Sequence, residues 1–170
     1  MGNISSNQSN TQDGNVIVWL DSGPTAYINF GIASALSKID KCNFIGIVSD
    51  KQDLSFFQNQ QITSFQKLFY YPDCYLNKST FDLNNLKKFE EKFNFNIWLD
   101  IFTERSFYKY WVDFHKFTDK EILSIIYHTL SFFVDVIEKN KPKLIIMKQV
   151  GDNVSSLLFD SVAKKLGIKI

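Results

Sequence analysis

The sequence predicts an α/β fold: a Rossmann-like, doubly wound, mostly parallel sheet with helices on both faces and a helical insertion. Short apolar runs alternate with longer amphipathic segments along the chain, which is the order of elements in βαβ units. The runs are apolar at consecutive positions, as in strands buried on both faces of a parallel sheet. Residues that favour helix starts, mainly Asp, Ser, Gly and Asn, follow three of these runs. Because crossovers between parallel strands are right-handed, helices are expected on both sheet faces.

The N-terminal part predicts one βα unit. Residues 16–20 (VIVWL) form the first strand, and a helix is expected from Pro24 to about Ile39. Pro24 suits the first helical position, with Ser22 or Gly23 as the cap. The residues spaced for the buried face of this helix are Ile28, Ile32, Ala35 and Leu36.

A second unit and a weaker strand follow. The run 44–48 (FIGIV) predicts a second strand, which ends at Ser49-Asp50. A short helix is expected over 54–60. Residues 65–71 predict a third strand that Pro72 stops, because proline lacks the amide proton that a sheet ladder needs.

The middle of the chain is longer than a minimal βα connection requires. We expect residues 77–116 to form a helical insertion over one edge of the sheet or over its crevice. Within it, 83–93 predicts a helix, and 96–99 a short strand or an apolar turn. Residues 106–114 place aromatic side chains at helical spacing, which favours a buried face there. Those side chains are Phe107, Tyr110, Trp111 and Phe114.

The regular pattern returns after this insertion. Thr118 and Glu121 match a capping box, with Thr118 as the N-cap and Glu121 three residues later. The long amphipathic helix behind it ends before Lys141-Pro142. Residues 144–147 (LIIM) then predict another buried strand.

The C-terminal end predicts a helix over 153–166, with Gly167 as the glycine that ends it. Residues 168–170 begin a further apolar strand. We therefore expect 15–170 to be a single Rossmann-like domain and the N-terminal half of a longer two-domain protein. The polar segment 1–14 is expected to be disordered.

Composition excludes several classes of function. The 19 Lys and Arg residues against 18 Asp and Glu leave a net charge of +1, without the basic surplus of a nucleic-acid-binding protein. Cys42 and Cys74 form no CxxC pair, so we expect no metal site and a reducing, cytoplasmic location. No run approaches the roughly 18 apolar residues of a membrane span. The sequence is thus compatible with, at most, peripheral association with a membrane.

Two loops are the first candidate site. In a doubly wound sheet, ligands bind beyond the carboxyl ends of the strands, where the strand order reverses. With the order 3-2-1-4-5, the loops after the first and fourth strands flank that crevice, and each opens a helix whose backbone N–H groups suit an anion. The candidates are Asp21 as a catalytic base, and Ser22, Gly23, Lys148, Gly151, Asp152 and Asn153 as substrate-binding residues. Plain helix capping is the alternative role for these residue types.

A second candidate site follows from charge chemistry. Arg105 is the single arginine among 19 basic residues, and its planar guanidinium suits a phosphate or carboxylate. Glu104 and His115 are candidate acid/base residues, and a structural ion pair is the alternative for Glu104 and Arg105. Neither GxGxxG nor GxxxxGK[ST] occurs, so we expect this chain to bind no dinucleotide or other cofactor of the usual type.

Several stretches together resemble one family. They are 104–111 (ERSFYKYW), the capped helix with 121–123 (EIL) and Phe132-Phe133, 141–146 (KPKLII), and 158–159 (LF) through 167–169 (GIK). This ordered set looks like the N-terminal part of capsule or surface-polysaccharide biosynthesis proteins. Those proteins resemble GT-B glycosyltransferases, which have two Rossmann-like halves with a cleft between them. The resemblance covers about 16–170 and is most specific from Glu104 onward.

The resemblance implies an acceptor-side domain. Such a half contacts the sugar or glycan acceptor, while a nucleotide-sugar donor is held mostly by the second half, so this chain alone is expected to be inactive. The Glu-Arg of the pattern falls on Glu104 and Arg105, without an assigned role. The first loop lacks the glycine-rich turn of many GT-B enzymes, so a donor-phosphate contact at Gly23 is not implied. A self-contained flavodoxin- or receiver-like regulatory module and half of a sugar-nucleotide epimerase are the alternatives.

Overall fold

The structure is a computed structural model that describes residues 14–21, 23–103, 107, 113–147 and 153–170. The expectation of disorder over 1–14 lies outside these residues except at Gly14, which is the first residue of a strand. Tyr110 and Trp111 of the expected aromatic face also lie outside them. Of the other two aromatic residues of that face, Phe107 is buried and Phe114 is exposed.

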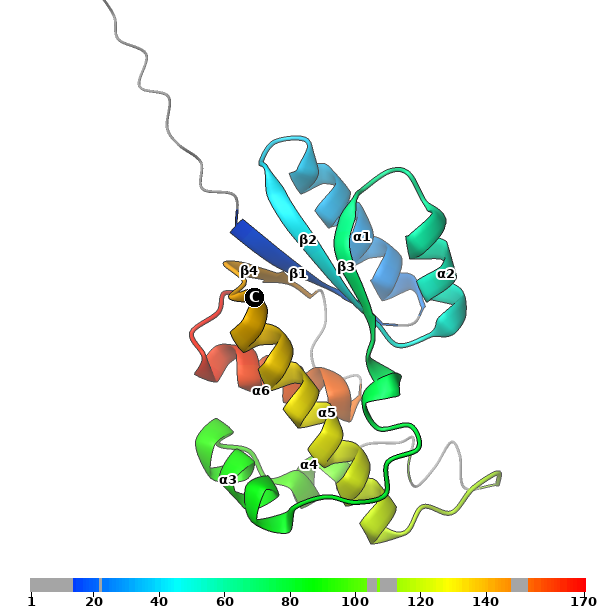
Figure 1. Ribbon diagram of the computed structural model, residues 1–170, viewed down its shortest axis with the longest axis vertical. Helices are drawn as coiled ribbons and strands as arrows, with labels where there is room; N and C mark the ends of the chain where they lie inside the picture. The colour runs from blue at the N-terminus through cyan, green and yellow to red at the C-terminus, as the bar shows by residue number, and fades with distance from the viewer. Residues whose placement is uncertain (1–13, 22, 104–106, 108–112, 148–152) are drawn as a thin grey trace, which may run out of the picture.

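Four apolar runs pair into one sheet, which confirms the predicted α/β class (Figure 1). The strands are β1 (Gly14–Leu20), β2 (Cys42–Val48), β3 (Phe65–Tyr70) and β4 (Leu144–Ile146). Their order is β3-β2-β1-β4, and all three pairs are parallel. Near the C-terminus, Lys169 forms a parallel β-bridge with Leu144. This bridge lies on the edge of β4 opposite to the edge that pairs with β1. The sheet thus follows the expected order 3-2-1-4, with a fifth position started beside β4.

Helices cover both faces of the sheet because successive side chains of a strand point to opposite faces. Val16, Val18 and Leu20 of β1 belong to the core beneath α1 (Pro24–Ser37) and α2 (Lys51–Asn59). Ile17 and Trp19 belong to the core beneath α5 (Asp119–Asn140) and α6 (Val154–Lys165). Figure 1 shows the two helix pairs on opposite sides of the strands.

The buried face of α1 differs from the one that the sequence predicts. Ile28 and Ile32 are exposed, whereas the face toward the sheet carries Ala26, Asn29, Phe30, Ala33 and Ser34. Small alanines let the helix lie close to the strands, and the Asn29 side-chain amide donates a 2.8 Å hydrogen bond to the Trp19 carbonyl. Because α1 carries apolar residues on all of its sides, their spacing alone did not identify the face that is buried.

Between β3 and α5, the described residues include two α-helices that form an outer layer on the α5/α6 side. They are α3 (Leu83–Phe93) and α4 (Ile97–Thr103). α3 matches its predicted bounds and ends at Asn94, whose φ of 55° is left-handed. It contacts α5 through Lys92 and Glu138, whose charged groups are 3.5 Å apart, and through the Phe89 and Tyr127 rings.

The strand or turn predicted over 96–99 is wrong, because these residues begin α4. The Asn96 side chain accepts a 3.0 Å hydrogen bond from the Leu99 amide, as an N-cap does. Ile97 and Ile101, four residues apart, are both buried, which is the spacing of a helix face. Both signals are present in the sequence, but the apolar run is too short to separate helix from strand.

The C-terminal elements match their predictions closely. Thr118 and Glu121 form the expected capping box at the start of α5. Asn153 caps α6 through a hydrogen bond of 2.8 Å from the Ser156 amide to its side-chain oxygen. Gly167 follows this helix with a φ of 73°, a left-handed conformation that favours glycine.

Candidate functional site

The four parallel strands have their carboxyl ends at the same edge of the sheet. The strand order reverses between β1 and β4. Asp21 directly follows β1, and Asn153 precedes α6, the helix after β4. The Asn153 side-chain amide donates a 2.7 Å hydrogen bond to Asp21 Oδ2, across 132 positions of sequence. The two loops that the sequence predicts to flank the crevice therefore meet at these residues.

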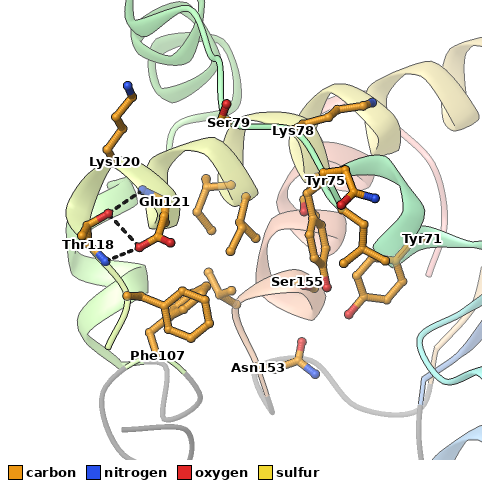
Figure 2. A pocket seen from close by; sticks show the side chains of 17 residues that line it. Tyr71, Tyr75, Lys78, Ser79, Phe107, Thr118, Lys120, Glu121, Asn153 and Ser155 are labelled. Carbon is orange, nitrogen blue, oxygen red and sulfur yellow. Dashed lines mark hydrogen bonds between the residues drawn. The ribbon is translucent and has the colours of Figure 1, made fainter. Parts of the chain in front are cut away.

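A cavity of about 780 Å³ lies beside this junction (Figure 2). Its walls come from the short 3-10 helix η1 (Tyr71–Cys74) and the loop after it, from the N-terminal half of α5, and from the first turn of α6. Its volume is in the usual range for small-molecule sites in proteins. Four aromatic side chains contribute to the lining: Tyr71, Tyr75, Phe107 and Phe117.

Tyr71 is the most constrained of these aromatic residues. It directly follows β3, is buried, and stacks on Trp19 with ring centroids 5.8 Å apart. Ser155, in the first turn of α6, lines the same cavity as Tyr71. Burial first, and the charge of Asp21 second, hold the pKa of Tyr71 well above its ordinary value. The phenol is therefore protonated at neutral pH and cannot serve as a base there.

Tyr75 continues the wall along the same chain segment, and Cys74 directly precedes it in the sequence. Burial raises the pKa of Tyr75 to about 12 and that of the Cys74 thiol to about 11. The Cys74 sulfur lies 3.9 Å from the Thr129 hydroxyl, which also lines the cavity. A thiol with so high a pKa is a poor nucleophile, and Cys74 is not among the described residues that line the cavity, so this segment suits binding and not covalent chemistry.

The start of α5 forms the opposite wall. Glu121 Oε2 accepts hydrogen bonds from the Thr118 amide at 2.7 Å and the Thr118 hydroxyl at 2.8 Å (Figure 2). The backbone hydrogen bond from Thr118 is the main reason that the pKa of Glu121 is lowered. His115 Nε2 lies 3.2 Å from Glu121 Oε1, and the His115 ring packs edge-on against Phe117. His115, a predicted catalytic residue, thus lies at the cap of α5 and not among the residues that line the cavity.

The remaining predicted site residues fall into two groups. Gly23 caps α1 with a φ of 83° and no side-chain hydrogen bond, and a Cβ built on it would meet nothing within 4 Å. The others lie outside the described residues: Ser22, Glu104, Arg105, Lys148, Gly151 and Asp152. Among the predicted residues that the structure describes, Asp21 and Asn153 come together, and Asn153 alone lines the cavity.

Tyr71, Tyr75 and Thr129, which line the cavity, were not among the site residues predicted from the sequence. A signal for the first two was present, because Tyr71-Pro72 directly follows an apolar strand whose end lies at the ligand-binding edge. Thr129 lies on the long helix whose other residues were predicted to form the core. Only its position around that helix directs it toward the cavity.

The described parts of the chain hold no group of three or more His, Cys, Asp and Glu side chains arranged for a metal ion. Within those same parts, no helix has the length and apolar character needed to cross a bilayer. Comparisons of the sequence and structure with protein-family models, curated proteins and solved structures find no match.

Proposed function

We propose that this chain is the acceptor-side, Rossmann-like domain of a glycosyltransferase-like protein of surface-polysaccharide biosynthesis, and that its cavity binds a sugar unit. The observation that carries the proposal is the aromatic-lined cavity beside the Asp21–Asn153 junction. Ligands of doubly wound sheets bind at such a switch point, beyond the carboxyl ends of the strands.

The chemistry of the walls suits a hydroxyl-rich ligand, and the charged residues Lys78, Lys120 and Glu121 also line the cavity. Aromatic faces, here those of Tyr75 and Phe117, offer apolar contact to the C–H face of a sugar ring. Uncharged hydrogen-bonding groups, such as Thr129 and Ser155, lie on the same walls. Small-molecule sites typically combine an apolar lining with a few polar groups in this way.

The cavity is less suited to chemistry by this chain alone. Glu121 is the one carboxylate among the described lining residues, and both of its oxygens are engaged by Thr118 and His115. A general base must reach the proton it removes, and a carboxylate engaged in this way is poorly placed to do so. The proposal therefore assigns binding to this chain and transfer to the longer protein. We predict that the 170-residue chain alone transfers no sugar; measurable transfer by it would contradict this assignment.

A receiver-like regulatory module is less well supported. Such a module needs acidic side chains grouped at the carboxyl ends of its strands. Here Asp21 accepts from Asn153, and Asp50 accepts from the Gln52 and Asp53 amides as the N-cap of α2. The two strand-end aspartates thus have separate structural roles.

The proposal is tested by measuring sugar affinity in matched tyrosine variants. Wild-type chain is titrated with a panel of monosaccharides and nucleotide sugars by saturation-transfer NMR and calorimetry. Binding of at least one sugar is expected, with a Kd of about 1 mM, the range for a single weak site. Tyr75→Ala removes a cavity wall and should weaken that binding, whereas Tyr70→Ala removes a tyrosine that lies outside the cavity lining and should not. Absence of binding to the whole panel, or equal binding by both variants, would contradict the proposal.

A further inference from the structure

The outward face of α1 has the reverse of the usual surface pattern. A helix that covers a sheet normally presents polar residues to solvent. In α1 the polar residues Asn29 and Ser34 are buried, while Pro24, Tyr27, Ile28, Gly31, Ile32 and Ala35 are exposed. The exposed fractions are 44% for Tyr27, 41% for Ile28 and 47% for Ile32. Phe56 of α2, whose ring lies 5.4 Å from that of Tyr27, extends this surface.

The centre of this α1 face has the shape of a helix-packing surface. Gly31 lies between Ile28 and Ile32, and a Cβ built on it meets nothing within 4 Å. A glycine at the middle of a helix lets a second helix approach closely, with the flanking isoleucines packing on either side. Contiguous exposed apolar surface of this kind marks an interaction site more often than a solvated surface.

The charges around the α1 face are self-complementary. Near the N-terminal end of α1, Asp53 of α2 accepts a 2.8 Å hydrogen bond from the Tyr27 hydroxyl. At the C-terminal end lies Lys38, exposed and without an ion-pair partner among the described residues. Tyr27 and Lys38 are eleven positions apart, close to three helical turns, so both lie on the flank of α1 that faces α2.

We propose that a second copy of this chain binds here, with the two α1 helices antiparallel about a two-fold axis near Gly31. An antiparallel pair related by such an axis keeps both α2 flanks on the same side. Each Asp53 then faces Lys38 of the other copy, so both ends of the interface carry opposite charges. A two-fold interface must be complementary to itself, and this arrangement of charge meets that condition. The inference is independent of the proposed sugar site, which lies on the other side of the sheet.

The first test is the oligomeric state, measured by sedimentation velocity over a wide concentration range. Wild-type chain is expected to pass from monomer to dimer in the micromolar range, as small interfaces do. The double substitution Ile28→Glu and Ile32→Glu should raise the dimer Kd by about tenfold or more, because it places charges on an apolar contact. Ile62→Glu is the matched control: Ile62 is exposed between α2 and β3, outside the α1 face, and its replacement should change nothing. Far-UV circular dichroism checks that each variant is folded.

A charge swap tests the antiparallel geometry. Lys38→Asp alone and Asp53→Lys alone should each weaken the dimer severalfold, and the two changes in one chain should restore it. A chain that stays monomeric at every concentration overturns the inference, as does a dimer that survives the two glutamates. Additive weakening by the charge changes, without rescue, overturns the antiparallel arrangement.

Discussion

Asn153 donates a 2.7 Å hydrogen bond from its side-chain amide to the carboxylate of Asp21, and this contact joins the first and last loops of the sheet. The same Asn153 side chain accepts from the Ser156 amide with its oxygen, so it caps α6 while it holds Asp21. The sugar cavity that we propose lies directly beside this contact, and Asn153 is one of the residues that line it.

Replacing Asn153 by alanine should destabilise the domain. The change removes the cap of α6 and one hydrogen bond to Asp21, so the free energy of unfolding should fall by about 1–2 kcal/mol. Urea denaturation measures this. Asn153→Asp keeps the capping oxygen but places a carboxylate against Asp21, and should also destabilise; adding Asp21→Asn should restore much of the loss. Equal stability of Asn153→Asp and wild type would show that the contact contributes nothing.

Removing the N-cap of α5 should destabilise the helix that forms the opposite wall. Thr118→Ala takes away the hydroxyl that accepts from the Glu121 amide at 3.3 Å, at a cost of about 1 kcal/mol. Thermal unfolding should shift accordingly. Thr80→Ala, a change in the irregular segment before α3, is the control and should leave the melting temperature nearly unchanged.

Acid should weaken the same cap. The pKa of Glu121 is lowered in the folded chain, mainly by the Thr118 amide. A carboxylate with a lowered pKa contributes stability that is present above its unfolded pKa and is lost as pH falls through the folded pKa. Wild-type chain should therefore lose more stability on acidification than Glu121→Gln does, as followed by denaturation at a series of pH values. If the stability of the two proteins fell equally with pH, the stabilising role of the ionised Glu121 in the cap would be contradicted.

Cys74 should resist alkylation in the folded chain. Its pKa is raised from 9.0 to about 11, so at pH 8 its thiolate population is about a hundredfold lower than that of an ordinary cysteine. In a Cys42→Ser background, where Cys74 is the single thiol, iodoacetamide should react at least that much more slowly with the folded than with the denatured chain. Similar rates in both states would place Cys74 in a more open setting than the structure does.

Two glycines should respond to alanine in opposite directions. A Cβ on Gly46 of β2 would collide with Leu68 and Leu20 side chains, so Gly46→Ala should destabilise by about 1–3 kcal/mol. Gly31 lies in open space on α1, and Gly31→Ala should stabilise the monomer by about 0.5–1 kcal/mol through helix propensity. Denaturation of dilute protein measures both, and a Gly46→Ala variant as stable as wild type would contradict the packing of β2.

The ends of helices were predicted well from the sequence, because single capping residues determine the backbone geometry there. Thr118 and Glu121 identified the start of α5, and Gly167 the end of α6. The order of strands followed from general rules on parallel sheets. The sequence could not orient α1, because its apolar residues lie on every side and only the packing of Ala26 and Ala33 selects a face.

The sequence predicted where the candidate site lies better than it predicted which residues form its walls. Asp21 and Asn153 were expected at the crevice, and they meet there. Tyr71 and Tyr75 were not expected, because they join the site through the turn of η1 after β3, and a turn of that kind has no helical or strand periodicity to read. Binding residues on such connections depend on tertiary packing, which a linear pattern does not contain.

The most direct test of the sugar site is an amide-resolved NMR titration of the chain with the best-binding sugar of the panel. Chemical-shift changes are expected at the amides of the cavity walls, from Tyr71 to Ser79 and from Asn153 to Ser155, while the amides of α1 should not shift. Changes confined to other surfaces, or no change at saturating sugar, would contradict the proposed sugar site.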